Sequence, residues 1–143
     1  MKDEKLNGIY WTLRITYGLV PLLAGLDKYF GLLADWERYL SPTAASLLPV
    51  APSTFFHLIG VVEIAVGLAV LTGATRLGAL VASGWLVLIS LDLILGGFFD
   101  VAIRDLSMAV GAYSLASVAA LRGEVLVPHF GSVTAHPAHA RSG

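Results

Sequence analysis

The stretch LRITYGLVPLLAGLDKYF, residues 13–30, decides how this chain folds. It is long and apolar enough for a membrane-spanning helix, yet it contains two cations and several small or helix-bending residues. At about 100° per residue these residues share one helix face: Arg14, Gly18, Pro21, Gly25 and Lys28. The opposite flank carries four leucines: Leu13, Leu19, Leu23 and Leu26. We therefore expect the first face to contact protein and the leucine face to contact lipid.

The composition of the 143-residue chain predicts an integral membrane protein. Hydrophobic residues make up 57% of it and charged residues 13%, and the mean hydropathy of +0.79 is too high for a soluble domain of this size. A helix needs roughly 20 residues to cross a hydrocarbon core. Four stretches are that long: near 8–30, 54–73, 77–99 and 101–121. The predicted fold is all-α, a four-helix membrane bundle over residues 1–122, followed by an irregular cytoplasmic tail at 123–143.

Several kinds of site are excluded or not supported. The chain has no cysteine, which excludes disulfides, thiolate metal sites and cysteine nucleophiles. A net charge of −1 without a basic run gives no support for nucleic-acid binding. His57 alone cannot make a bis-histidine haem site. The other histidines have no accompanying carboxylate or thiolate, so no metal site is predicted at His129, His136 and His139.

Charge asymmetry predicts the orientation in the membrane. Basic residues flank one side of the four-span arrangement, namely Lys2, Lys5, Arg76 and Arg122. By the positive-inside rule, we expect both termini in the cytoplasm of a bacterial-type inner membrane. The first span carries Arg14 and lacks a small-residue cleavage site, so we expect it to be retained and not cleaved as a signal peptide.

The longest connection follows the first span and is expected to be partly helical. Ser41 and Pro42 match a helix cap followed by proline at the first helical position, and Pro49 must end that short helix. Two interpretations are open for this outer loop, which runs over Leu32 to Leu48. It is either a structured lid or an ordinary hydrophobic loop pressed against the membrane.

The second span contains a carboxylate, Glu63, well inside the membrane. Such a group costs about 2.5–3.5 kcal/mol on insertion scales unless it is protonated or paired, so Glu63 must face the bundle interior. Gly60 and Gly67 share its face and would let a neighbouring backbone approach closely. Arg14 of the first span either reaches the inner interface or pairs with Glu63.

Polar residues from all four spans converge near the outer end if the spans alternate in direction. They are Asp27, Lys28, His57, Asp92, Arg104 and Asp105, with Glu63 a turn or two deeper. One interpretation is a ligand site for a quinone-type head group under the lid, bordered by Lys28, His57, Asp92 and Arg104. The other is structural ion pairing of Lys28 or Arg104 with Asp92 or Asp105. Three intramembrane charges are assigned a structural or functional role: Arg14, Glu63 and Asp105.

Three segments together resemble the DoxX-like family of small membrane proteins. The first is the spacing of Arg14, Gly18, Gly25 and Lys28. The others are GVVEIAVGLAVLTGATRLGAL, residues 60–80, and AIRDLSMAVGA, residues 102–112. The resemblance extends over residues 9–122 and implies a four-helix membrane bundle. Some members of that family are subunits of quinone-reducing oxidoreductases or associate with soluble redox enzymes. The long lid, Asp27 and the histidine-bearing tail depart from the family pattern.

The expected function is that of a small membrane subunit, not of a catalyst acting alone. It would provide a quinone-type ligand site, or a membrane anchor, for a redox partner. No covalent cofactor is expected, and a quinone is the candidate bound group. The expected partners are the lipid bilayer and membrane or membrane-associated redox proteins, or a second copy of the chain. The alternative is a purely structural accessory subunit of a larger membrane complex.

Overall fold

A computed structural model describes residues 2–127 and contains four long helices. They are α1 (Lys2–Phe30), α3 (Pro52–Thr72), α4 (Thr75–Leu95) and α5 (Phe99–Leu121). Each is long and apolar enough to cross a membrane. The predicted all-α fold with four candidate spans is confirmed for the described part of the chain. Most of the expected tail, with its three histidines, lies outside the described residues.

The connection between α1 and α3 contains two short helices, η1 (Trp36–Tyr39) and α2 (Pro42–Leu47). We call this connection, residues 31–51, the lid. The Ser41 hydroxyl accepts a hydrogen bond from the backbone N–H of Ala44 at 3.0 Å, and Pro42 occupies the first turn of α2. The cap and proline predicted to open this helix are therefore confirmed.

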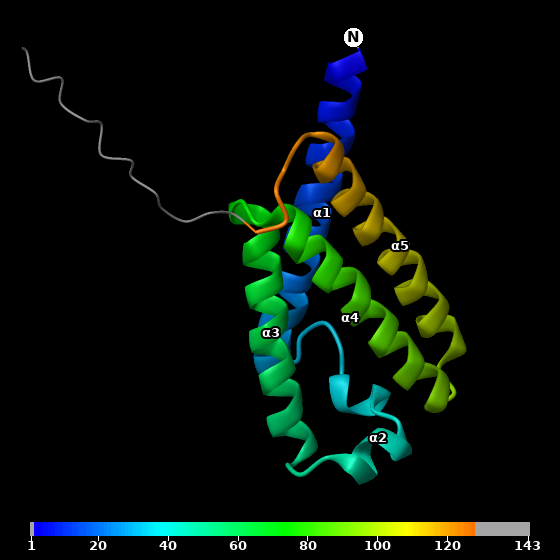
Figure 1. The fold of residues 1–143 in the computed structure, drawn as a ribbon. Helices are drawn as coiled ribbons and strands as arrows, with labels where there is room; N and C mark the ends of the chain where they lie inside the picture. Colours follow the sequence, from blue (N-terminus) through cyan, green and yellow to red (C-terminus); the bar gives the residue numbers. More distant parts are fainter. Residues whose placement is uncertain (1, 128–143) are drawn as a thin grey trace, which may run out of the picture.

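The long helices form two pairs, α1 with α3 and α4 with α5 (Figure 1). The pairs meet where α1 begins and α5 ends, and they diverge toward the lid. We call these two regions the terminal end and the lid end of the bundle. The third span was expected near 77–99, but α4 already ends at Leu95. It stops there because the chain turns at Gly97, whose φ of 81° is a conformation that glycine adopts without strain.

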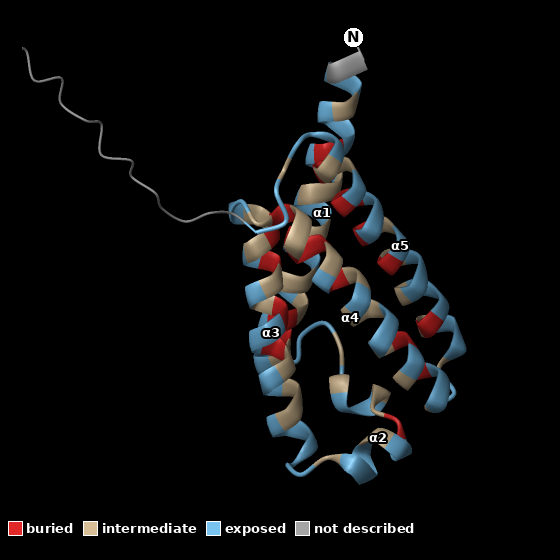
Figure 2. Ribbon diagram, viewed as in Figure 1, coloured by how far each residue is buried: buried red, intermediate tan, exposed pale blue. Residues whose placement is uncertain are grey.

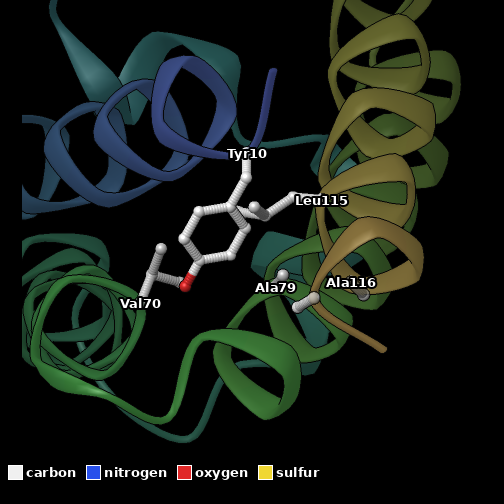
Figure 3. Packing of buried hydrophobic residues seen from close by; sticks show 6 residues of the cluster. Tyr10, Val70, Ala79, Leu115 and Ala116 are labelled. Atoms are coloured by element: carbon white, nitrogen blue, oxygen red, sulfur yellow. The ribbon is translucent and has the colours of Figure 1, made fainter. Parts of the chain in front are cut away.

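The hydrophobic core lies at the terminal end. Its buried members come from all four long helices: Tyr10, Val70, Ala79, Leu115, Ala116 and Ala119. The Tyr10 ring extends from α1 toward Val70 and lies beside Leu115 (Figure 3). Figure 2 shows buried positions on the inward faces of the helices and exposed positions around the outside.

The leucine flank of α1 is exposed at Leu19, Leu23 and Leu26, as expected for a lipid-facing surface. Leu13 differs, because it packs against the core cluster. It lies close in the chain to Tyr10, at the terminal end, where the two helix pairs meet and cover more of the α1 surface.

Glycines bring the backbones of α1 and α3 into direct contact. A Cβ atom added at Gly25 would lie 2.6 Å from the carbonyl oxygen of Gly60, and one at Gly60 would lie 2.7 Å from that of Gly25. A Cβ at Gly67 would lie 2.6 Å from the carbonyl oxygen of Gly18. The close approach predicted for Gly60 and Gly67 is confirmed, and its partners are the two glycines of the α1 face.

Candidate functional site

A buried ion pair joins α1 to α3 near the lid end. The Nζ atom of Lys28 lies 2.5 Å from Oε2 of Glu63, and the two side chains are only 3% and 9% exposed. The contact between Gly25 and Gly60 holds the two backbones together beside this pair. Because both charges are removed from solvent, each depends on the other for compensation. The carboxylate that the sequence places inside the membrane is thus paired, and its partner is Lys28.

The lid covers the lysine side of this pair. Nζ of Lys28 lies 3.8 Å from the centre of the Trp36 ring, a cation–π contact. The indole Nε1 of Trp36 donates a hydrogen bond of 2.9 Å to the Asp27 carboxylate. Trp36 therefore connects the lid to two neighbouring residues of α1, and its ring covers one side of the Lys28 ammonium.

Asp27 organises the first residues of the lid. Its carboxylate accepts hydrogen bonds from the backbone N–H groups of Leu32 at 2.7 Å, Leu33 at 2.9 Å and Ala34 at 3.3 Å. A short acidic side chain that bonds nearby backbone N–H groups is a common way to fix a turn. Asp27 lies at the end of the bundle that the sequence predicts, but its role in fixing this turn was not predicted. The available signal was an aspartate in the last turn of a helix, four residues before the glycine that follows the helix end.

A groove lies between the lid and the first turns of α3, with a volume of about 270 Å³. We call it the lid groove, and it is lined by Lys28, Gly31, Ala34, Asp35, Trp36, Glu37, Ser53, Phe56 and His57. An engineered cavity of about 150 Å³ is large enough for benzene. The lid groove therefore has room for a planar six-membered ring and its substituents.

His57 is held in a defined orientation at this groove. Its ring stacks on that of Tyr29 with centroids 4.8 Å apart and an interplanar angle of 6°. The Tyr29 hydroxyl also donates a hydrogen bond of 2.8 Å to the His57 carbonyl oxygen. Lys28 and His57, whose side chains can both donate hydrogen bonds, thus line the same groove.

A second hollow, which we call the central cavity, lies between the four long helices and has a volume of about 70 Å³. Its lining includes Glu63 together with Tyr17, Pro21, Ala82 and Trp85. Lys28 lines the lid groove and Glu63 lines the central cavity, so the ion pair stands between the two hollows. No single stretch of sequence indicates this arrangement.

Asp92 and Arg104 do not line the lid groove. The carboxylate of Asp92 accepts hydrogen bonds from the Ser41 hydroxyl and, at 3.3 Å, from the Ser41 backbone N–H. It therefore attaches the lid to α4. Arg104 is exposed on α5 and acts electrostatically on its neighbour Asp105. Of the four predicted ligand residues, the structure brings Lys28 and His57 together at one groove.

Arg14 belongs to a different cluster, at the terminal end. Its Nε and Nη2 atoms donate hydrogen bonds to the carbonyl oxygens of Val70 at 2.9 Å and Leu71 at 2.8 Å. These carbonyls have no partner within α3 because the helix ends at Thr72. Two roles were considered for Arg14, and the structure shows the first: the side chain bonds the end of α3 at the terminal end and does not pair with Glu63. The arginine caps a helix, and a cation is favourable at that position.

A family model described as DoxX matches residues 10–95, more than half of the chain. The matched range contains the lid, both partners of the ion pair and every residue that lines the lid groove. The family resemblance seen in the sequence is confirmed over this range. No curated protein and no solved structure matches the chain.

Proposed function

The chain belongs to the DoxX family, and we propose that it is a membrane subunit whose lid groove binds the ring of a quinone-type ligand for a redox partner. The observation that carries this proposal is the groove itself. A ring-sized hollow between an aromatic residue of the lid and one of α3, Trp36 and Phe56, is bordered by a buried lysine.

The chemistry of the groove suits a planar ring that carries carbonyl oxygens. Lys28 has three N–H donors, of which one is directed at Glu63, so a carbonyl oxygen in the groove can accept another. The His57 imidazole offers a second donor at the same groove. Trp36 and Phe56 provide apolar walls for the ring faces. Electrons would come from the redox partner, so the chain is proposed as a binding subunit and not as a catalyst on its own.

Binding of a short-chain benzoquinone to the purified full chain tests this proposal. At a concentration of about 100 Kd, a ligand specific for the folded state adds about 2.7 kcal/mol to stability, so we expect a clear rise in melting temperature. Because Trp36 lines the groove, the quinone should also quench tryptophan fluorescence. His57→Ala should weaken both effects by removing one hydrogen-bond donor.

Arg104→Ala is the matched control for this experiment. Arg104 is exposed, lies on α5 and is not part of the groove lining, so binding should be unchanged. If saturating quinone produces neither a melting shift nor quenching, the ligand site is refuted. The chain would then be better described as a purely structural accessory subunit.

We further propose that the chain lies in a bacterial-type inner membrane with both termini in the cytoplasm. The support is the predominance of Lys2, Lys5, Arg76 and Arg122 at the terminal end. Reporter fusions after Gly143 and within Ala44–Ser46 should report opposite sides of the membrane, with the C-terminal fusion cytoplasmic. Fusions that report the same side would contradict the four-span topology, and a periplasmic C-terminus would contradict the orientation.

A further inference from the structure

We propose that the chain just where the lid begins is inserted among the lipid acyl chains of the membrane leaflet at the lid end. We call this segment, residues 30–33, the lid entry. Three of its four side chains are large, apolar and mostly exposed: Phe30 at 70%, Leu32 at 84% and Leu33 at 71%. Such a cluster on a protein surface marks a contact with an apolar partner. The inference does not depend on whether a ligand occupies the lid groove.

The packing of α1 on α3 sets the depth of the lid entry. The two backbones meet where Gly25 faces Gly60. From this contact α3 extends eight residues toward the lid end, to Pro52, whereas α1 extends only five, to Phe30. At about 1.5 Å per residue, α1 ends about 4.5 Å short of the level at which α3 begins. Since α3 has 21 residues, about the number that crosses a hydrocarbon core, the lid entry lies inside the edge of that core.

A non-helical segment can lie at that depth only if its backbone N–H groups are bonded within the protein, because acyl chains accept no hydrogen bonds. The start of the lid meets this condition. The Gly31 N–H donates to the backbone carbonyl oxygen of Asp27 at 2.7 Å, and the next three N–H groups, up to Ala34, donate to the Asp27 carboxylate. One aspartate thus satisfies four successive donors. In water these groups could bond to solvent instead, so the arrangement matters most where water is absent.

The lid entry continues the surface of α1 that we assign to lipid. Leu23 and Leu26 are exposed on that surface, and Phe30 follows Leu26 by four residues, which places both on one helix face. The exposed charges of the lid begin only after the lid entry, at Asp35, and continue to Arg38. An apolar stretch beside charged residues is typical of a segment that rests at the boundary between acyl chains and head groups. Lipid is therefore the partner that best fits the lid entry.

Spin labels on single cysteines test the proposal, because the chain has no cysteine of its own. The purified full chain with Leu33→Cys is labelled with a nitroxide and placed in phosphatidylcholine liposomes. Oxygen concentrates among acyl chains, whereas a water-soluble nickel chelate is excluded from them. We expect the label at position 33 to collide more often with oxygen than with the chelate. A label at Leu23→Cys, on the lipid-facing surface of α1, should behave in the same way, and one at Arg38→Cys in the opposite way.

Two results would overturn the proposal. If the label at Leu33→Cys collides more often with the chelate, as at Arg38→Cys, the lid entry lies in water. If it collides rarely with both probes, the side chain is covered by protein, such as a second copy of the chain, and not by lipid.

Asp27→Ala tests the role assigned to the aspartate. Without the carboxylate, three backbone N–H groups lose their partner within the protein, so the lid entry should move toward water. The label at Leu33→Cys should then collide more often with the chelate than it does when Asp27 is present. Asp35→Ala removes an exposed acid of the same lid and should leave the collision rates unchanged. Equal rates in Asp27→Ala and Asp35→Ala would show that Asp27 does not hold the lid entry in the membrane. The comparison of Leu33→Cys with its two labelled controls stands even if Asp27→Ala does not fold.

Discussion

Replacing Gly25 with valine is expected to separate α1 from α3 and to cause one of the largest losses of stability of any single substitution in this protein. The added Cβ would lie 2.6 Å from the backbone oxygen of Gly60. A backbone atom cannot rotate away as a side chain can, so the helices themselves would have to move apart. Overpacking of this kind typically costs 1–3 kcal/mol and occasionally more. We expect about 3 kcal/mol or more here, measured by SDS-induced unfolding in mixed micelles.

Gly84→Ala is the control for this prediction. A Cβ at Gly84 would meet nothing within 4 Å, and alanine favours a helix over glycine by up to about 1 kcal/mol. Gly84→Ala should therefore be neutral or slightly stabilising. Equal stability of Gly25→Val and Gly84→Ala would mean that α1 and α3 do not pack through their glycines.

Much of the fold was predictable because membrane helices follow simple periodic and length rules. The number of spans follows from the number of apolar stretches that are long enough, as helices, to cross the hydrocarbon core of a bilayer. The contact between α1 and α3 was predictable in outline, because Gly25 and Gly60 each lie on a face that also carries a charge. The turn at Gly96 and Gly97 was predictable from the two glycines, but the span near 77–99 was drawn too long, because the apolar stretch continues through Phe98 and Phe99 while α4 ends at Leu95 and the backbone already turns at Gly97.

The partners of the charged residues were much harder to predict. Periodicity places Arg14, Lys28 and Glu63 on interior faces, but the depth at which α1 and α3 are aligned decides which cation meets the carboxylate. That alignment is set by which glycines face each other, Gly25 with Gly60 and Gly18 with Gly67. It places Glu63 beside Lys28 and leaves Arg14 at the end of α3.

The lid shows the same limitation at the candidate site. Asp92 was grouped with the ligand residues because it lies near the lid end of α4. Its bonds with Ser41 attach the lid to that helix instead. The partner residue lies 51 positions away in the chain, and no local pattern connects the two. Lys28 of α1 and His57 of α3 line one groove because the lid brings the end of α1 and the start of α3 together there.

Removing one partner of the Lys28–Glu63 pair is expected to destabilise the protein about as strongly as the glycine substitution. Both side chains are almost fully buried, so the remaining charge would lack compensation. Loss of one partner of a buried pair costs about 3–5 kcal/mol. We expect losses of this size for Lys28→Met and for Glu63→Gln. Arg38→Met, which removes an exposed cation of the lid, should change stability by less than about 1 kcal/mol.

The measurement that tests the account most directly is a double-mutant cycle on this pair. The unfolding free energies of the unchanged protein, Lys28→Met, Glu63→Gln and the double variant are compared under identical detergent conditions. If the two groups form the buried link between the lid groove and the central cavity, the double variant should lose much less than the sum of the single losses, because neither charge is left alone. Strictly additive losses would show that Lys28 and Glu63 do not interact, and would contradict the site described here.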